Sequence, residues 1–189
     1  CGHLPNKNYT EYLAANSGVE PRNLISADYR IKEGTTSATD FSFQALTNKT
    51  IGKKLPFTKS VVGKAYCNGY FQFNACNYCD DIFAETADLT VLDAWLPKYI
   101  QDTRGTSFVV SRSSVALELL ENAIVNNECA LENVTAKEVL QSQDGVIHQK
   151  RALLRGRLFQ ATIFGKKIPQ KRVSPSLLAW LFGAYEILV

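Results

Sequence analysis

The sequence predicts an α/β or α+β fold: a mixed sheet with helices on its faces and an irregular cysteine-bearing loop along one side. Short β-prone runs alternate with capped helical segments along the chain. A strand is followed directly by a capped helix between residues 106 and 126. Between Cys67 and Asp81, the Cys, Asn, Gly and aromatic residues follow neither the helical nor the strand period. These observations favour a single domain over residues 1–189.

The first half of the chain predicts a short helix and then a β-hairpin. Residues 8–16 carry apolar residues at helical spacing, with Thr10 as the candidate cap, and Gly18 ends this helix. Residues 23–32 and 41–46 alternate apolar and polar side chains on either side of a polar turn. This alternation is typical of two strands that pair as a hairpin.

The middle of the chain predicts two more strands and a long helix. Residues 87–95 are apolar and β-prone, which indicates a buried strand, and residues 106–112 form a second short strand. Ser113 or Ser114 can cap the helix that follows, whose apolar stripe ends at Asn126.

Three helices are predicted in the remainder of the chain. A Thr-x-x-Glu capping box begins the helix at residues 135–143. Residues 147–163 mix Lys and Arg with Leu and predict a basic amphipathic helix. Residues 174–188 are rich in Leu and aromatic residues, so they predict a packed helix or one that docks onto another domain or a partner.

Composition excludes several classes of protein. With 189 residues, 46% of them hydrophobic and 21% charged, the chain can bury a core. The net charge of +3 is spread along the chain, which does not indicate a nucleic-acid-binding stripe. No run approaches the ~20 apolar residues of a membrane span, and no signal peptide is seen, so we expect a cytoplasmic protein. Because the chain starts at Cys1 and lacks Met, we expect a fragment of a longer protein, and the resemblance described below implies that it is the C-terminal part.

Cysteines give the strongest functional signal. Cys67, Cys76 and Cys79 lie within 13 residues, which in a cytosolic chain favours metal or redox chemistry over disulfides. Two thiolates spaced as Cys76-x-x-Cys79 can bind one metal centre, and a third thiolate can come from a nearby part of the chain. Both iron–sulfur clusters and structural zinc use this geometry. Buried free thiols and a thioredoxin-like redox pair are the alternatives. Cys129 is interpreted as a half-buried thiol.

Other residues are weaker candidates for ligand contacts. Asp93 and Trp95 end a predicted strand, where ligands bind in α/β folds. The turn Arg104-Gly-Thr-Ser offers N–H groups, hydroxyls and a guanidinium to a phosphate. The basic stretch 150–157 has two interpretations. It binds an anionic cofactor or an acidic partner, or it is a helix face exposed to solvent.

Several segments resemble the C-terminal region of coenzyme F-420 hydrogenase/dehydrogenase beta subunits. The resemblance is strongest in the central block with its CNYCDD run, and it covers nearly the whole chain. The segments that carry it are CGHLPNKNYTEYL at 1–13, DYRIK at 28–32, YCNGYFQFNACNYCDDIFAETADLTVLDAWLPKY at 66–99, RGTSFVVSR at 104–112 and QKRALLRGRL at 149–158.

The resemblance implies an iron–sulfur flavoprotein that serves as an oxidoreductase subunit. Members of this family hold a 4Fe-4S cluster and FAD or FMN, and some relatives use coenzyme F-420. They transfer electrons between the flavin and a deazaflavin, a ferredoxin or a partner subunit. A homo-oligomer is compatible with this interpretation, and no nucleic acid or membrane span is expected.

The resemblance also assigns candidate residues. Cys76 and Cys79 match the family's Cys-x-x-Cys, Cys1 matches the cysteine before its glycine turn, and Cys67 stands where a subgroup has a cysteine. These four are the predicted metal ligands. The family commonly has Gly-Asp where this chain has Leu92-Asp93, and a side chain at residue 92 would crowd a flavin that approaches the backbone.

The predicted flavin contacts are Asp93, Trp95, Gly105, Thr106 and Ser107; no catalytic residue is predicted. The alternative function is a zinc-stabilised binding module without redox activity, which would use the same four cysteines as a closed tetrahedral site. A third interpretation is an α/β scaffold with free thiols.

Overall fold

The computed structural model describes residues 3–34, 36–58 and 60–181, which divide into two compact units. The described part of unit 1 comprises residues 77–96 and 107–181. Unit 2 comprises residues 3–76, without residues 35 and 59, and residues 97–106. The single domain over residues 1–189 stays a prediction. No helix in the described ranges is long and apolar enough to cross a membrane.

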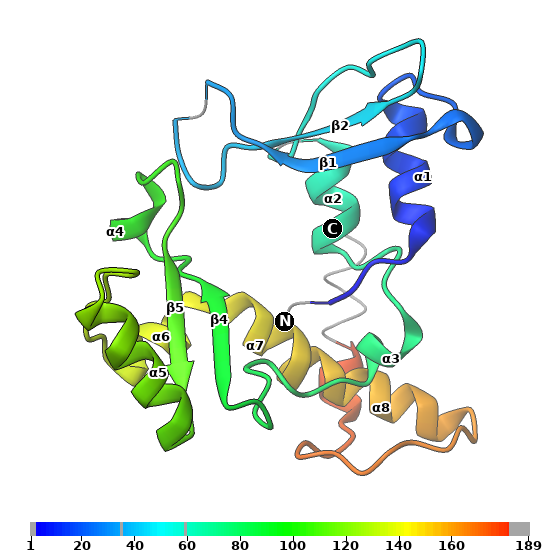
Figure 1. The fold of residues 1–189 in the computed structure, drawn as a ribbon. Helices are drawn as coiled ribbons and strands as arrows, with labels where there is room; N and C mark the ends of the chain where they lie inside the picture. Colours follow the sequence, from blue (N-terminus) through cyan, green and yellow to red (C-terminus); the bar gives the residue numbers. More distant parts are fainter. Residues whose placement is uncertain (1–2, 35, 59, 182–189) are drawn as a thin grey trace. The chain divides into compact units, whose positions relative to one another are not determined.

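Unit 2 is built on a three-stranded antiparallel sheet in the order β1-β2-β3 (Figure 1). Its elements are α1 (Lys7–Asn16), the 3-10 helix η1 (Pro21–Asn23), β1 (Ser26–Ile31), β2 (Ser42–Leu46), β3 (Leu55–Pro56), α2 (Val61–Cys67) and α4 (Pro97–Ile100), with α3 (Asn74–Asn77) at its boundary. Ser26 pairs with Leu46 and Phe43 with Leu55, which sets the register of the three strands.

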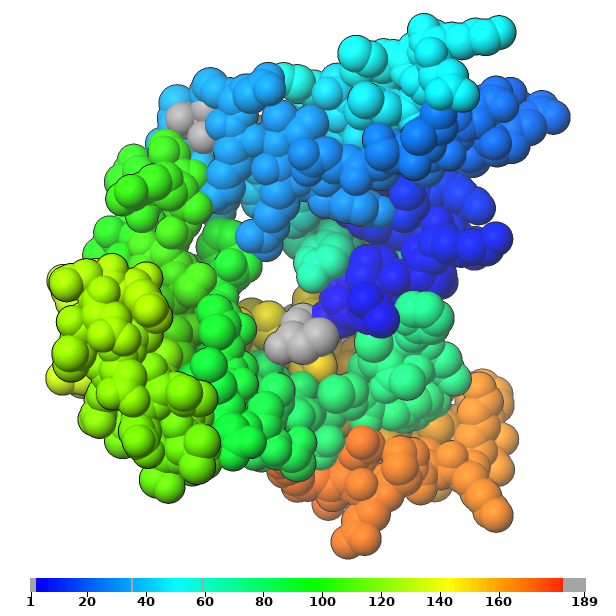
Figure 2. Space-filling view, in the orientation of Figure 1, coloured from blue at the N-terminus to red at the C-terminus, as the bar shows by residue number. Residues whose placement is uncertain are grey.

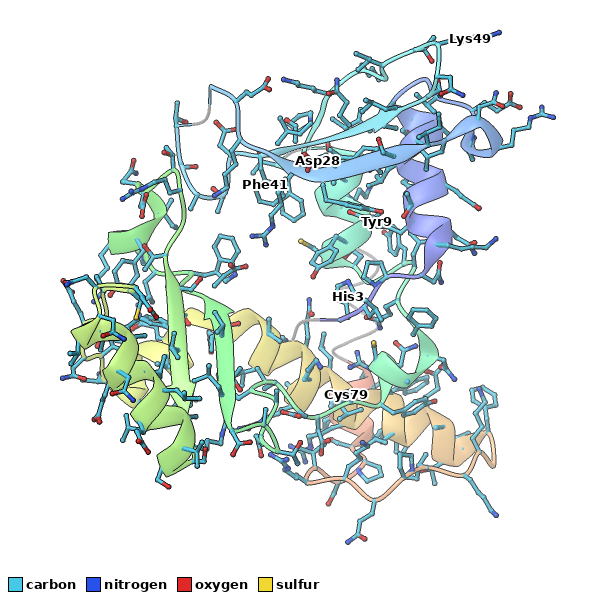
Figure 3. All side chains as sticks on the ribbon, viewed as in Figure 1. His3, Tyr9, Asp28, Phe41, Lys49 and Cys79 are labelled. Atoms are coloured by element: carbon cyan, nitrogen blue, oxygen red, sulfur yellow. The ribbon has the colours of Figure 1, made fainter. Side chains whose placement is uncertain are left out.

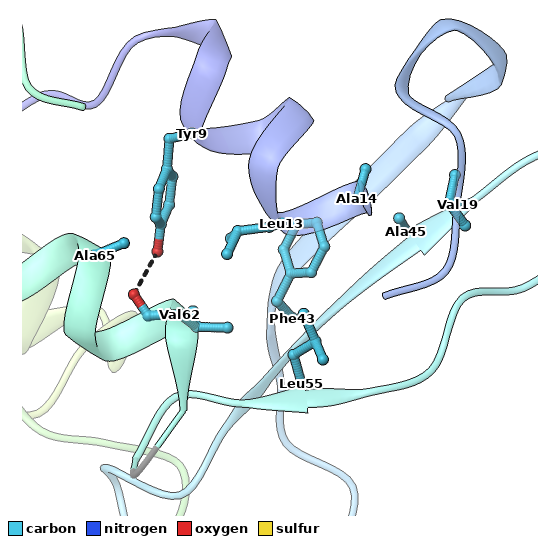
Figure 4. Packing of buried hydrophobic residues seen from close by; sticks show 9 residues of the cluster. All are labelled: Tyr9, Leu13, Ala14, Val19, Phe43, Ala45, Leu55, Val62 and Ala65. Atoms are coloured by element: carbon cyan, nitrogen blue, oxygen red, sulfur yellow. Dashed lines mark hydrogen bonds between the residues drawn. The ribbon is translucent and has the colours of Figure 1, made fainter. Parts of the chain in front are cut away.

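The core of unit 2 lies between this sheet and the helices α1 and α2 (Figure 4). Alternate residues of β2, Phe43 and Ala45, point into the core because strand side chains alternate between faces. Leu13 of α1 and Val62 of α2 pack in the same cluster. The Tyr9 hydroxyl donates to the carbonyl oxygen of Val62 at 3.1 Å, and burial raises the pKa of Tyr9, with Tyr29 and Tyr66 adding to the effect.

Unit 1 pairs two antiparallel strands with a set of helices. Its elements are β4 (Leu89–Asp93), β5 (Ser107–Ser111), α5 (Ser114–Val125), α6 (Ala136–Ser142), α7 (Asp144–Ile147), the π-helix η2 (His148–Ala152) and α8 (Leu153–Ile163). Leu89 pairs with Ser111 and Asp93 with Ser107. The space-filling view shows α5 and the orange segment of residues 160–175 at the surface (Figure 2).

The predicted mixture of helices and strands is confirmed, and so are most of its elements. The hairpin of β1 and β2, the helix caps at Ser113 and Thr135 and the capping box with Glu138 form as expected. In the described residues, however, the strands form two separate antiparallel sheets rather than one mixed sheet. The predicted irregular stretch at 67–81 contains a helical turn, α3.

Two sequence-based details are wrong. Asn6, not Thr10, caps α1, since its side-chain oxygen accepts from the Asn8 N–H at 2.9 Å. The strand predicted to be buried, β4, has only Thr90 buried, because one of its faces is open. Helix α5 forms as predicted, and Ala116 is its buried residue.

The last described residues cross α8 at close range. Residues 177–181 are helical, and the predicted helix 174–188 extends outside the described residues from 182 onward. Ser176 N–H donates to the Arg155 carbonyl oxygen at 3.0 Å, and the rings of Phe159 and Trp180 lie 6.0 Å apart. A Cβ on Gly156 would lie 2.8 Å from the Ala179 carbonyl oxygen, so only glycine permits this approach.

Substitution of Gly156 by alanine is therefore expected to separate α8 from the segment that crosses it. We expect G156A to lower the free energy of unfolding by about 1–3 kcal/mol, a typical cost of overpacking. The matched control is G145A in α7, where a Cβ would meet no atom within 4 Å. G145A should raise stability by up to about 1 kcal/mol through helix propensity. Equal urea unfolding curves for the two variants would contradict this crossing.

Candidate functional site

The segment from Asn77 to Asp81, which carries Cys79, is held by two cationic side chains of the helix η2–α8. Lys150 Nζ donates to Cys79 Sγ at 3.3 Å and to the Asp81 carbonyl oxygen at 2.9 Å. Arg157 Nε donates to the Asn77 carbonyl oxygen at 2.9 Å. Figure 3 shows Cys79 beside this helix. The basic helix therefore fixes the backbone on both sides of the cysteine.

Lys150 is an unusual buried cation. Only 4% of its surface is exposed, and it lies in the π-helical turn η2. Lysine is almost never buried without a partner, because desolvating a charge is costly. Its partners here are a sulfur and a carbonyl oxygen, and neither belongs to a carboxylate. Single π-turns within α-helices occur frequently at functional sites.

Lys150 and Arg157 both donate to backbone carbonyl oxygens of the segment from Asn77 to Asp81. Lys150 belongs to the π-helical turn η2 and Arg157 to the regular helix α8. Leu154 and Leu158 are fully buried in the same helix, so that its apolar residues anchor it in unit 1. The apolar anchor and the two cations together explain how a helix with a basic, amphipathic sequence packs against the cysteine segment.

Asp80, next to Cys79, is held by the chain that follows α8. Its carboxylate accepts from the Arg172 N–H at 3.1 Å and pairs with Lys171 Nζ at 3.4 Å. Burial of Asp80 acts against its ionised form, but the Arg172 N–H and the Lys171 charge outweigh it, so the pKa of Asp80 lies below its usual value. Glu85 pairs with the Arg172 guanidinium nearer the surface.

The predicted cysteine ligands fall in different parts of the structure. Cys67 ends α2, and partial burial raises the pKa of its thiol. Cys76 lies in α3, where its Sγ accepts from the Leu4 N–H at 3.4 Å. Cys67 and Cys76 belong to unit 2 and Cys79 to unit 1, while Cys1 lies outside the described residues.

No metal-binding group is assembled within the part of the chain that the structure describes. There, no three His, Cys, Asp or Glu side chains come together in a way that could hold a metal ion. The four-cysteine ligand set therefore remains a prediction. Each sulfur of the Cys76-x-x-Cys79 pair does receive one N–H group, from Leu4 and Lys150 respectively. Cluster-bound thiolates are stabilised by hydrogen bonds of this kind, so the pair fits such a ligand role.

The predicted flavin contacts divide between the two units. Asp93 and Ser107 are cross-strand partners at one end of the β4–β5 sheet. The Asp93 carbonyl oxygen accepts from Gln143 Nε2 at 2.7 Å and from the Trp95 N–H at 3.2 Å. These bonds fix the strand end that carries Asp93 and Trp95, as a ligand-binding edge requires.

Gly105 and Thr106 belong to a turn in unit 2. Gly105 has a φ of +88°, which suits glycine. The Asp102 carboxylate accepts from the Arg104 N–H at 3.0 Å and from the Thr106 hydroxyl at 3.4 Å, so this turn already holds an anionic group. A flavin role for these two residues and for Asp93, Trp95 and Ser107 stays a prediction.

Sequence reasoning did not single out Lys150 and Arg157. Both lie in the stretch interpreted as a basic helix that either is solvated or meets an anion. Their spacing of seven residues among leucines was the available signal, because in a regular helix it would place two cations on one face. The π-helical turn that carries Lys150 has no signature in the sequence.

The geometry defines a protein of helices and two small antiparallel sheets, in which Cys76 and Cys79 each accept one hydrogen bond from an N–H group. Residues 1–137 match the family model for the C terminus of the coenzyme F420 hydrogenase/dehydrogenase beta subunit. The chain belongs to this family, which confirms the resemblance over residues 1–137. The resemblance at 149–158 lies beyond the matched residues and stays a prediction. No curated protein was found to match the chain. The helices η2 and α8 lie beyond the matched residues.

Removing the Asp80 carboxylate is expected to loosen the segment around Cys79. D80N should lower the free energy of unfolding by about 1–3 kcal/mol, because the half-buried Lys171 charge loses its partner. E85Q is the matched control: it removes a more exposed pair and should cost less than about 1 kcal/mol. Urea unfolding at neutral pH measures both. A D80N variant as stable as the wild type would contradict this role of Asp80.

Proposed function

We propose that this protein is an oxidoreductase subunit that uses a 4Fe-4S cluster and a flavin to transfer electrons. Its electron partners would be a deazaflavin such as coenzyme F-420, a ferredoxin or a partner subunit. One observation supports the proposal most: both sulfurs of the Cys76-x-x-Cys79 pair receive an N–H group. Membership in a family named for hydrogenase and dehydrogenase beta subunits supports the same class of reaction.

The cysteines would hold the cluster. Cys76 and Cys79 would supply two thiolates, and Cys1 and Cys67 are the proposed remaining ligands. A bound 4Fe-4S cluster supplies single-electron transfer, and a flavin connects this to hydride chemistry. Free thiols and such a cluster need a reducing compartment, which favours the cytoplasm.

The protein's own residues would set the electrostatic environment of Cys79. Lys150 places a buried positive charge and an N–H group on this sulfur. Positive charge beside an anionic cluster favours its reduced form, which carries one more electron. The paired Asp80 carboxylate is neutralised by Lys171, so it offsets this effect little.

For the flavin, the proposed contacts are Asp93, Trp95, Gly105, Thr106 and Ser107. The ordered end of the β4–β5 sheet supports Asp93, Trp95 and Ser107, since hydrogen bonds hold its backbone in place. FAD and FMN both fit this proposal. Leu92 has a side chain where the family commonly has glycine, so a flavin would approach this strand less closely here.

The full-length protein purified without oxygen tests the proposal. We expect broad visible absorption that bleaches on reduction, an EPR signal of the reduced state, and about four iron and four sulfide per chain. C79S should lose the absorption and most of the iron. C129S is the matched control and should keep both, because Cys129 is remote in sequence from the other cysteines.

The alternative of a zinc-stabilised binding module predicts a different result. A zinc protein would be colourless and would carry one zinc per chain in a closed cysteine site. That result, or a protein without metal, would overturn electron transfer through a cluster.

A further inference from the structure

Unit 1 contains a small cleft where α8 ends, beside the residues that follow Cys76. Its volume is about 300 Å³ and lies at the lower end of the range for ligand pockets. The lining residues are Asn77, Tyr78, Arg157, Gln160, Ala161, Phe164 and Lys166. Two of these are cations and none is an acid.

Arg157 is the central group of this cleft. Its Nε donates to the Asn77 carbonyl oxygen at 2.9 Å, and its Nη2 donates to the Gln149 carbonyl oxygen at 2.8 Å. A guanidinium has five N–H groups, and five less these two leaves three for another acceptor. The two carbonyl bonds hold the guanidinium in place, so it is oriented before any ligand arrives.

The charge of Arg157 has no acidic partner in the described chain. Its contacts are two neutral carbonyl groups, and no ion pair includes it. Burial lowers the pKa of Arg157, which shows that its charge is incompletely solvated, while Tyr78 acts in the opposite direction. A half-buried cation of this kind is stabilised when an anion enters beside it.

The other lining residues favour a ligand that also carries a ring. Lys166 adds a second, exposed cation at the cleft, and the side chain of Gln160 offers an amide. Tyr78 and Phe164 contribute aromatic rings, and 68% of the Phe164 surface is exposed. Exposed aromatic side chains beside cations are typical of sites that bind bases and phosphates together.

We propose that this cleft binds a mononucleotide, with the phosphate at Arg157 and Lys166 and the base against Tyr78 or Phe164. Arginine suits phosphate because its planar fork offers several N–H groups to the oxygens. The cleft is built partly from residues beyond the family match, since α8 follows residue 137. None of the lining residues is a proposed flavin contact or cluster ligand, so this site lies apart from the electron-transfer function and does not depend on a cluster.

Calorimetric titration of the full-length protein with adenosine 5′-monophosphate tests this site. Adenosine and inorganic phosphate are titrated in parallel, because they lack the phosphate and the ring respectively. The mononucleotide should bind at least tenfold more tightly than either. Binding should weaken with added salt, since cations hold the phosphate.

Variants at the exposed lining residues separate a binding role from a structural one. K166Q should weaken binding several-fold, and F164A should weaken it about tenfold. K167Q is the matched control, because it removes the same charge one residue away from the lining. It should bind like the wild type. R157Q should abolish binding, and its circular dichroism and unfolding curve show whether the fold persists.

Two results would contradict the proposed mononucleotide site. If the mononucleotide does not bind at millimolar concentration, or binds equally to the wild type, K166Q and F164A, the cleft is not its site. Arg157 would then serve only to hold Asn77 and Gln149. The presence or absence of iron in the same samples tests the proposed electron transfer separately.

Discussion

The buried ammonium of Lys150 is the interaction on which the arrangement around Cys79 depends. It joins the sulfur of Cys79 to the backbone of Asp81 and is itself fixed by the π-helical turn η2. Removing an ammonium from water costs several kcal/mol even after the protein relaxes. A carboxylate would normally repay that cost, and here a sulfur and a carbonyl oxygen take its place.

The rest of unit 1 supports this contact. Leu154 and Leu158 anchor α8 in the core, and the close crossing at Gly156 brings the following chain back against the helix. Lys171 and Arg172 then reach Asp80, so the cysteine segment is held from two stretches of the C-terminal chain. Packing, rather than local propensity, therefore positions the groups around Cys79.

Local signals in the sequence predicted most elements, because caps and alternation are short-range patterns. Ser113 and Thr135 cap helices as their residue types indicate, and the alternating residues 41–46 place Phe43 and Ala45 in the core. The cap of α1 was missed since Asn6 and Thr10 are both good caps and only packing decides between them. The burial of β4 was overestimated, because an apolar run does not reveal how many of its faces are covered.

The candidate site was predictable only in part. The spacing of Cys76 and Cys79 marks them as a pair, but nothing local shows that Lys150 reaches Cys79, a partner 71 residues away. The helical period also assumes a regular helix, whereas Lys150 lies in a π-turn that rotates the residues after it. Long-range contacts and irregular turns are thus the parts that sequence patterns do not encode.

The role of Lys150 at the sulfur of Cys79 is tested by the midpoint reduction potential of the anaerobically purified protein, compared with that of K150M. Methionine keeps the length of the side chain but removes its charge and its N–H groups. We expect K150M to hold a cluster whose reduction potential is more negative than that of the wild type. The reduction potential of K150R should lie closer to that of the wild type. Equal potentials for the wild type and K150M would contradict a role for Lys150 at the sulfur of Cys79.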